Sequence, residues 1–225
     1  MNGPILGGFA PIIYKTASTQ VVYDGNSLVF GIGSTGGQQL PVQQAAASPI
    51  NGGLTITNTA VSGQTINDMR TRGPTYVDPL YNPSKNNVLI VWEGTNSICN
   101  TPVRTGMEAI GDLIAYIAER RAANPNWKIV VLTTIPRYYM QGTSNSNGNA
   151  QMIIYNNYIL ANYKDMGIDA VVDVRTNAAF VYTGTGTMPS WMTPYSSDGH
   201  THLNNAGYAI IAGMVAPVIR RLPKR

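Results

Sequence analysis

The sequence predicts one α/β domain built on a parallel sheet with crossover helices. Short runs rich in β-branched residues alternate along the chain with segments that have the apolar spacing of helices. One run, VLIVW at Val88–Trp92, is almost wholly apolar, as expected for a strand that helices cover on both faces. The chain has 225 residues, 44% of them hydrophobic, which suits a single domain with a full core.

Five segments have the composition of strands. We expect these strands, in chain order, at Gln20–Asp24, Leu54–Asn58, Val88–Trp92, Lys128–Thr133 and Ala170–Val174. Residues 1–19 precede the first strand and are expected to form an N-terminal arm, so the domain itself would be residues 20–225.

Three segments carry an apolar stripe with helical spacing. The expected helices run over Arg104–Arg121, over Ala150–Met166 and from the residue after Asn204 to near the C-terminus. Pro217 lies inside the last of them and is expected to kink it. Two stretches are expected to be loops: residues 142–149, which are rich in Gly, Ser and Asn, and residues 180–197, which are rich in aromatic residues and Met.

The charge pattern argues against several classes of partner. Charged residues make up 12% of the chain, against about 25% in an average protein. Arg120, Arg121, Arg220 and Arg221 lie at the ends of predicted helices, where they would complement the helix dipole and stay solvated. The sequence has no basic stripe interleaved with aromatic residues, so nucleic-acid binding is not expected. No stretch approaches the ~20 apolar residues of a membrane span.

Cysteine content and the N-terminus bear on location. The single cysteine, Cys99, excludes an internal disulfide and a cysteine-based metal site. The first residues lack the basic region and the cleavage site of a signal peptide. A surface rich in Asn, Thr, Ser and Gln suits a secreted or virion-associated protein, and this is the expectation, although localisation and oligomeric state stay open.

Three segments with possible chemistry follow predicted strands, where ligands of parallel sheets bind. D-G-N-S-L at 24–28 puts Ser27 on a strand-to-helix turn, as a nucleophile or as a plain helix cap. N-T-A-V-S-G-Q-T at 58–65 contains Gly63, whose N–H could bind an oxyanion or belong to an ordinary turn. E-G-T-N at 93–96 ends in Asn96, an amide donor or part of an Asx turn.

A fourth segment, D-G-H-T-H-L-N-N-A-G-Y at 198–208, contains both histidines of the chain. Histidine is the usual general base for a serine nucleophile, and a nearby carboxylate orients its ring. A histidine-dependent mechanism must therefore use His200 or His202. The same residues could hold a metal ion, but no third histidine or acidic cluster completes a site, so no metal is expected.

In this order the four segments resemble the sequence blocks of the SGNH hydrolases, also called GDSL esterases and lipases. G-N-S-L resembles the GDS(L) block, the segment 58–65 the glycine block, G-T-N the G-x-N block, and the last segment the Asp-x-x-His block. The resemblance runs from about residue 20 to the C-terminus. It implies a flavodoxin-like three-layer α/β/α sandwich with a five-stranded parallel sheet.

The resemblance also implies roles for individual residues. Ser27 would be the nucleophile, His202 the base and Asp198 its orienting acid. The backbone N–H groups of Ser27 and Gly63 and the side chain of Asn96 would form the oxyanion hole. Such a site needs neither a cofactor nor a metal ion.

The sequence departs from the family pattern in three places. Asn26 stands where the family usually has Asp, and Ser97 follows Asn96 where Asp is common. Four positions separate Asp198 from His202, where the family has three.

The longer spacing leaves the identity of the base open. We favour His202 over His200, because L-N-N-A-G-Y after His202 matches the way the family enters its last helix. His200 would then be an inserted residue that is exposed or lines the pocket. Asp173, at the end of the fifth predicted strand, is a remote alternative for the acid, although a structural role at the strand end fits it better.

The implied function is a serine esterase for short acyl esters. The polar surface suits short acyl esters of carbohydrate, and so do aromatic residues on loops near the expected pocket, Trp191, Tyr195, Tyr138 and Tyr139, although these could also be packing residues. The resemblance implies acetyl as the acyl group, because the family includes many carbohydrate acetylesterases. The expected partner is thus a small-molecule or glycan ester. Two other functions stay open: a non-catalytic carbohydrate-binding or structural module of a phage or cell surface, and a thioesterase or lysophospholipase with the same triad.

Overall fold

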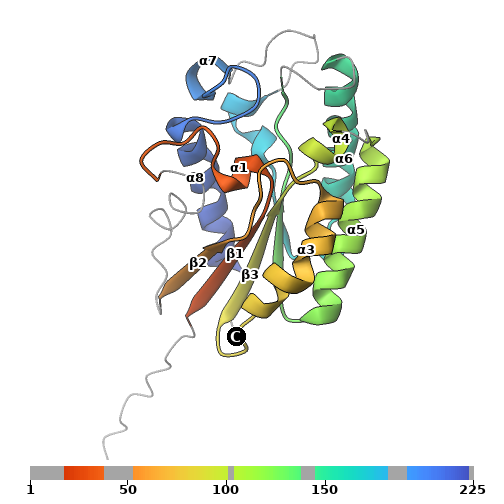
Figure 1. The fold of residues 1–225 in the computed structure, drawn as a ribbon, viewed down its shortest axis with the longest axis vertical. Coiled ribbons are helices and arrows are strands. Elements are labelled where there is room, and N and C mark those ends of the chain that lie inside the picture. Colours follow the sequence, from red (N-terminus) through yellow and green to blue (C-terminus); the bar gives the residue numbers. More distant parts are fainter. Residues whose placement is uncertain (1–17, 38–52, 101–103, 138–144, 182–191, 223–225) are drawn as a thin grey trace, which may run out of the picture.

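The computed structural model describes residues 18–37, 53–100, 104–137, 145–181 and 192–222. Its centre is a sheet of five parallel strands in the order β2-β1-β3-β4-β5 (Figure 1). The strands are β1 (Thr19–Gly25), β2 (Leu54–Asn58), β3 (Asn86–Trp92), β4 (Lys128–Leu132) and β5 (Ala170–Val172). The predicted five-stranded parallel sheet is confirmed, and each strand lies within a few residues of its predicted place. Of the expected arm, residues 1–19, residues 1–17 lie outside the described part, and Thr19 is the first residue of β1.

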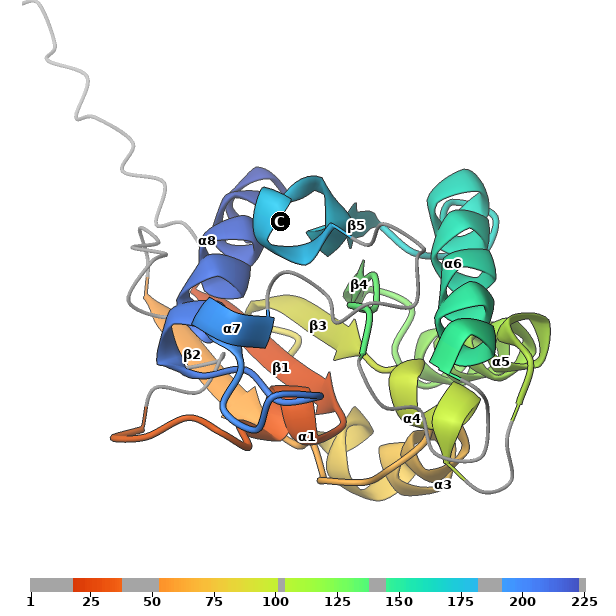
Figure 2. The same ribbon diagram turned by 90° about the horizontal axis from the view of Figure 1, so that it is seen from above.

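Helices cover both faces of the sheet, which makes a three-layer α/β/α sandwich (Figures 1 and 2). One face packs against α3 (Ile66–Tyr76), α5 (Gly106–Ala123) and α6 (Asn145–Asn162), and the other packs against α8 (Asn205–Arg221). Neighbouring strand residues point to opposite faces. Val21 and Tyr23 accordingly pack on the α8 side, while Val22 packs on the other side.

Short helices gather above the carboxyl ends of the strands. These are α1 (Ser27–Phe30), α4 (Thr95–Cys99) and α7 (Met192–Tyr195), with the 3₁₀ turns η2 (Val174–Thr176) and η3 (Ala178–Phe180) beyond β5. A further 3₁₀ turn, η1 (Asp78–Leu80), precedes β3 at the other end. The predicted site segments therefore converge at one edge of the sheet (Figure 2).

The structure differs from the predicted secondary structure at α3, at the start of α6, and at α7, which lies within residues 180–197 that were expected to be a loop. Helix α3 was not predicted, because Gly73 and Pro74 interrupt its helical pattern; a capping box between Thr65 and Asp68 starts it. Residues 145–149 were expected to be a loop and instead form the first turns of α6. Asn149 from this segment is buried, so its polar side chain serves an internal contact rather than a solvated loop.

The structure also corrects the prediction that Arg120 stays solvated at a helix end. Arg120 is 2% exposed, and its guanidinium lies 3.4 Å from Asp78 and over the ring of Tyr116. Gly73 makes room for it, since a Cβ there would overlap the guanidinium. Across the described ranges, no helix is long and apolar enough to cross a bilayer.

The tight end of β1 leads to a prediction about stability. A Cβ on Gly25 would lie 2.4 Å from the Trp92 carbonyl oxygen, whereas a Cβ on Gly111 of α5 would meet no atom within 4 Å. We expect Gly25→Ala to lower the free energy of unfolding by about 1–3 kcal/mol through overpacking. Gly111→Ala should leave it equal or raise it by up to ~1 kcal/mol, because alanine favours the helix. Urea titrations measure both, and an equal effect of the two substitutions would contradict the prediction.

Candidate active site

Ser27 is the first residue of α1, directly after the turn from β1, and only 6% of its surface is exposed. It does not cap the helix. Asn26 is the N-cap, and its Oδ1 accepts a hydrogen bond from the Leu28 N–H at 2.8 Å. Because Asn26 serves the helix end, the Ser27 hydroxyl is left for another partner.

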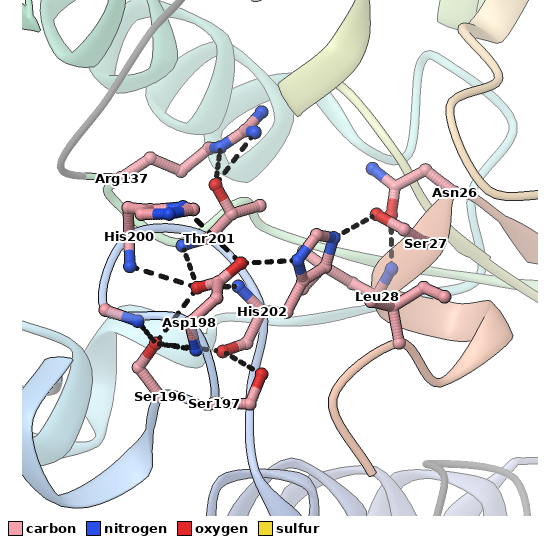
Figure 3. Close-up of polar contacts among 12 residues, drawn as sticks. Asn26, Ser27, Leu28, Arg137, Ser196, Ser197, Asp198, His200, Thr201 and His202 are labelled. Carbon is pink, nitrogen blue, oxygen red and sulfur yellow. Dashed lines mark hydrogen bonds and ion pairs between the residues drawn. The ribbon is translucent and has the colours of Figure 1, made fainter.

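That partner is His202, whose Nε2 lies 2.9 Å from Ser27 Oγ (Figure 3). On the other side of the ring, Nδ1 lies 2.6 Å from Asp198 Oδ2. A carboxylate accepts hydrogen bonds, so this contact assigns the ring proton to Nδ1 and leaves Nε2 able to accept the hydroxyl proton of Ser27. A continuous row of hydrogen bonds thus joins residues from opposite ends of the chain.

The loop around Asp198 shows how four positions fit between the acid and the histidine. Asp198 Oδ1 accepts the backbone N–H groups of His200, Thr201 and His202 at 3.0, 2.8 and 3.1 Å. The chain therefore wraps around one carboxylate oxygen and leaves the other to the His202 ring. Partial burial raises the pKa of Asp198, but these backbone bonds and His202 outweigh it and hold the pKa well below its usual range.

The alternatives for base and acid make other contacts than His202 and Asp198 do. His200 has a half-exposed side chain, and its Nδ1 lies 3.4 Å from Asp198 Oδ2. The contact with Ser27 belongs to the ring of His202. Asp173 forms an ion pair with Arg175 at 2.9 Å and accepts a hydrogen bond from the Thr133 hydroxyl. The structural role of Asp173 at the strand end is thus the one that its contacts support.

Gly63 lies in the loop after β2 and Asn96 lies in α4, both beyond the carboxyl ends of the strands. Gly63 has φ +85°, a conformation that favours glycine, and a Cβ there would meet no atom within 4 Å. Asn96 is buried inside α4 rather than in an Asx turn, and its Nδ2 donates to the Gln64 carbonyl at 3.1 Å. The amide of Asn96 therefore reaches the loop that carries Gly63.

A buried carboxylate that the sequence analysis did not single out joins the turn at Asn26 to α4. Glu93 is 1% exposed and accepts hydrogen bonds from Asn26 Nδ2 at 3.1 Å and from the Asn96 N–H at 3.1 Å. It also accepts from the Ser97 N–H and hydroxyl at 2.8 and 2.9 Å, and from the Gly94 N–H. Burial raises the pKa of Glu93, and these donors oppose the rise.

Glu93 accounts for two of the departures from the family pattern. Asn26 and Ser97 replace acids of the family, and both donate a hydrogen bond to Glu93. An aspartate at either position would bring a second carboxylate against a buried one, which is costly. The position of Glu93, directly after an apolar strand and before G-T-N, is the sequence signal that could have revealed it.

The four aromatic residues proposed for the pocket are only partly described. Tyr195 is half-buried, and its ring lies 6.4 Å from that of Phe180, so it packs against the α8 side of the core. Trp191, Tyr138 and Tyr139 lie outside the described residues. Within the described part of the chain, no three His, Cys, Asp or Glu side chains cluster as a metal site would require.

Comparison with known structures finds the same fold in other proteins. A lipolytic protein from Veillonella parvula matches with a TM-score of 0.68 and 20% identity, over 91% of this chain and 100% of its own. An acetylxylan esterase from Geobacillus stearothermophilus matches with a TM-score of 0.64 and 19% identity, over 92% and 96% of the two chains. A carbohydrate acetylesterase from Sinorhizobium meliloti matches with a TM-score of 0.65 and 17% identity, over 91% and 99%.

Sequence comparison gives the family. A search of curated protein sequences returned no significant match. The model of the GDSL-like lipase/acylhydrolase family matches residues 25–210, a range that contains the row from Ser27 to His202 and all four sequence blocks. The protein therefore belongs to the GDSL-like lipase/acylhydrolase family, and its α/β fold is that of the SGNH hydrolases.

Proposed function

We propose that the protein is a serine esterase that removes short acyl groups, above all acetyl groups, from carbohydrate esters. The observation that carries the proposal is the row of hydrogen bonds from Ser27 through His202 to Asp198. Membership of a family of lipases and acylhydrolases supports acyl transfer as the reaction.

In this mechanism Ser27 Oγ attacks the ester carbonyl while His202 Nε2 takes its proton. Asp198 keeps the ring in the productive tautomer and stabilises the imidazolium that forms. The imidazolium then protonates the leaving alcohol, and the same ring activates a water molecule that hydrolyses the acyl-enzyme. The ionised state of Asp198 suits this role, and the hydrogen bonds around it hold its pKa well below the usual range.

The proposed oxyanion hole consists of the Ser27 and Gly63 backbone N–H groups and the Asn96 amide. Among the described residues, neither backbone N–H donates to a protein acceptor, so both are left for a substrate oxygen. The Asn96 amide has two N–H bonds, and its contact with the Gln64 carbonyl uses one of them.

Two observations support an acetyl ester of carbohydrate as the substrate. An acetylxylan esterase and a carbohydrate acetylesterase are among the proteins that share the fold over more than nine tenths of this chain. The chain is also poor in charge and rich in hydrogen-bonding side chains, which suits a sugar surface.

The first prediction concerns the proposed catalytic residues. Ser27→Ala and His202→Ala should each lower kcat for p-nitrophenyl acetate by at least about 10³-fold, because nucleophile and base act as a unit. His200→Ala is the matched control, since that half-exposed ring shares Asp198 but does not contact Ser27, and it should keep activity within a fewfold of wild type. Loss of activity with His200→Ala alone would contradict the assignment of His202.

A second prediction concerns acyl length and acceptor. We expect release of acetate from acetylated xylan or another acetylated glycan, and a fall in kcat/KM from p-nitrophenyl acetate through butyrate to octanoate. Acetate release is measured directly, with Ser27→Ala as the blank. A preference for octanoate, with no acetate released from glycans, would overturn the substrate class and leave the serine mechanism intact.

The lowered pKa of Asp198 predicts how stability depends on pH. A carboxyl group whose pKa is lower in the folded than in the unfolded chain stabilises the fold above its unfolded pKa and loses this effect on acidification. The difference in the free energy of unfolding between wild type and Asp198→Asn should therefore be largest at pH 6. It should decrease as the pH falls below 3.8, the ordinary pKa of an aspartate side chain. Urea unfolding of both proteins from pH 6 to pH 3 measures it; a constant difference would contradict it.

A further inference from the structure

The loop from Asp198 to His202 is one residue longer than the family pattern. The side chain of Arg137, from another segment of the chain, donates hydrogen bonds to a residue of this loop. We propose that Arg137 is a positioning residue, which fixes the His202 ring for catalysis by clamping the side chain of Thr201. The inference rests on the proposed function, because it concerns how the proposed base is held.

The clamp consists of two hydrogen bonds to one oxygen. Arg137 Nε and Nη2 donate to Thr201 Oγ1 at 3.1 and 3.0 Å (Figure 3). Thr201 is 5% exposed, so its hydroxyl points inward and not to solvent. The planar guanidinium has a fixed fork of donors, and a β-branched side chain has few rotamers, so two such bonds leave the Thr201 side chain little freedom.

Thr201 transmits this constraint to the proposed catalytic pair. Its backbone N–H and that of the adjacent His202 both donate to Asp198 Oδ1, while the other oxygen of Asp198 holds the His202 ring. A shift of Thr201 would therefore move the backbone that surrounds the carboxylate. Without a side-chain anchor, the four-position loop would have more freedom than a three-position one.

Arg137 can serve as an anchor because it is itself fixed at several points. Its backbone N–H donates to Asn149 Oδ1 at 3.1 Å, and its carbonyl accepts from Asn149 Nδ2 at 3.0 Å. The guanidinium lies against Cys99 at the end of α4. Burial lowers the pKa of Arg137, but Cys99 and the negative charges of Glu93 and Asp198 act in the opposite direction. Arg137 thus contacts α6 through its backbone, and its half-buried guanidinium connects α4 with the histidine loop.

The test compares Thr201→Val, which keeps the shape but loses the acceptor, with Thr201→Ser, which keeps the hydroxyl. Thr201→Val should lower kcat for p-nitrophenyl acetate about 10- to 100-fold with KM within about twofold of wild type, because a misplaced base slows chemistry more than binding. Thr201→Ser should stay within about threefold. Thr71→Val, which removes an exposed hydroxyl on α3, is the control and should leave kcat unchanged.

The double variant Arg137→Met/Thr201→Val tests whether the two residues act together. Its kcat should fall no further than that of the more damaged single variant, since both substitutions break the same contact. Should Arg137→Met fail to fold, the two Thr201 variants still decide, with thermal unfolding showing that each is folded at the assay temperature. Equal kcat for Thr201→Val and Thr201→Ser would overturn the proposal.

A spectroscopic readout separates this inference from the proposed function. The His202 Nδ1 proton, shared with Asp198, should give a far-downfield proton NMR signal that His202→Ala removes and His200→Ala keeps. Thr201→Val should broaden or shift that signal upfield, and Thr201→Ser should preserve it. An inactive wild type would refute the esterase proposal alone, whereas an unchanged signal in Thr201→Val would refute the positioning role.

Discussion

The alignment of β1 with β3 is the constraint on which the whole site depends. These two central strands pair in parallel over seven positions, with Gly25 opposite Trp92 at their carboxyl ends. The residues that follow, Asn26 and Glu93, therefore start their loops side by side and meet in a hydrogen bond. A slip of one residue would turn every side chain of β1 to the other layer of the core, so the two hydrophobic layers hold this alignment in place.

Three buried or half-buried charged side chains then hold together the segments that follow the strands. Glu93 joins the turn at Asn26 to α4, Arg137 joins α4 to the histidine loop, and Asp198 accepts backbone N–H groups of that loop. Each carboxylate is surrounded by donors, and Arg137 donates twice to Thr201 Oγ1 and lies near the negative charges of Glu93 and Asp198, which offsets part of the cost of removing these charges from water. Removing one partner of such a contact lowers the free energy of unfolding, because it leaves a charge unpaired. The contacts also restrict the conformations of the side chains that take part in them.

Much of the fold could be predicted from the sequence, because its signals are local. Apolar runs gave the five strands, and the helices α5, α6 and α8 showed stripes at helical spacing. The prediction was wrong in two places where the local pattern is not helical. Helix α3 contains Gly73 and Pro74 and was not predicted, and the polar first turns of α6 were interpreted as a loop. There tertiary packing outweighed local propensity, since α3 buries Ile66 and Met69 against the sheet.

The sequence by itself determined which residues could carry the chemistry: one serine after a strand, two histidines in a single segment, and an acid beside them. Only the tertiary structure distinguished the two histidines by their contacts, because it places the ring of His202 at hydrogen-bond distance from a serine 175 positions away. It alone also showed Glu93 and Arg137 as partners of the site, since their contacts join segments far apart in the chain. Spacing along a chain specifies local geometry, whereas a pairing across the carboxyl edge of a sheet exists only once the strands are aligned.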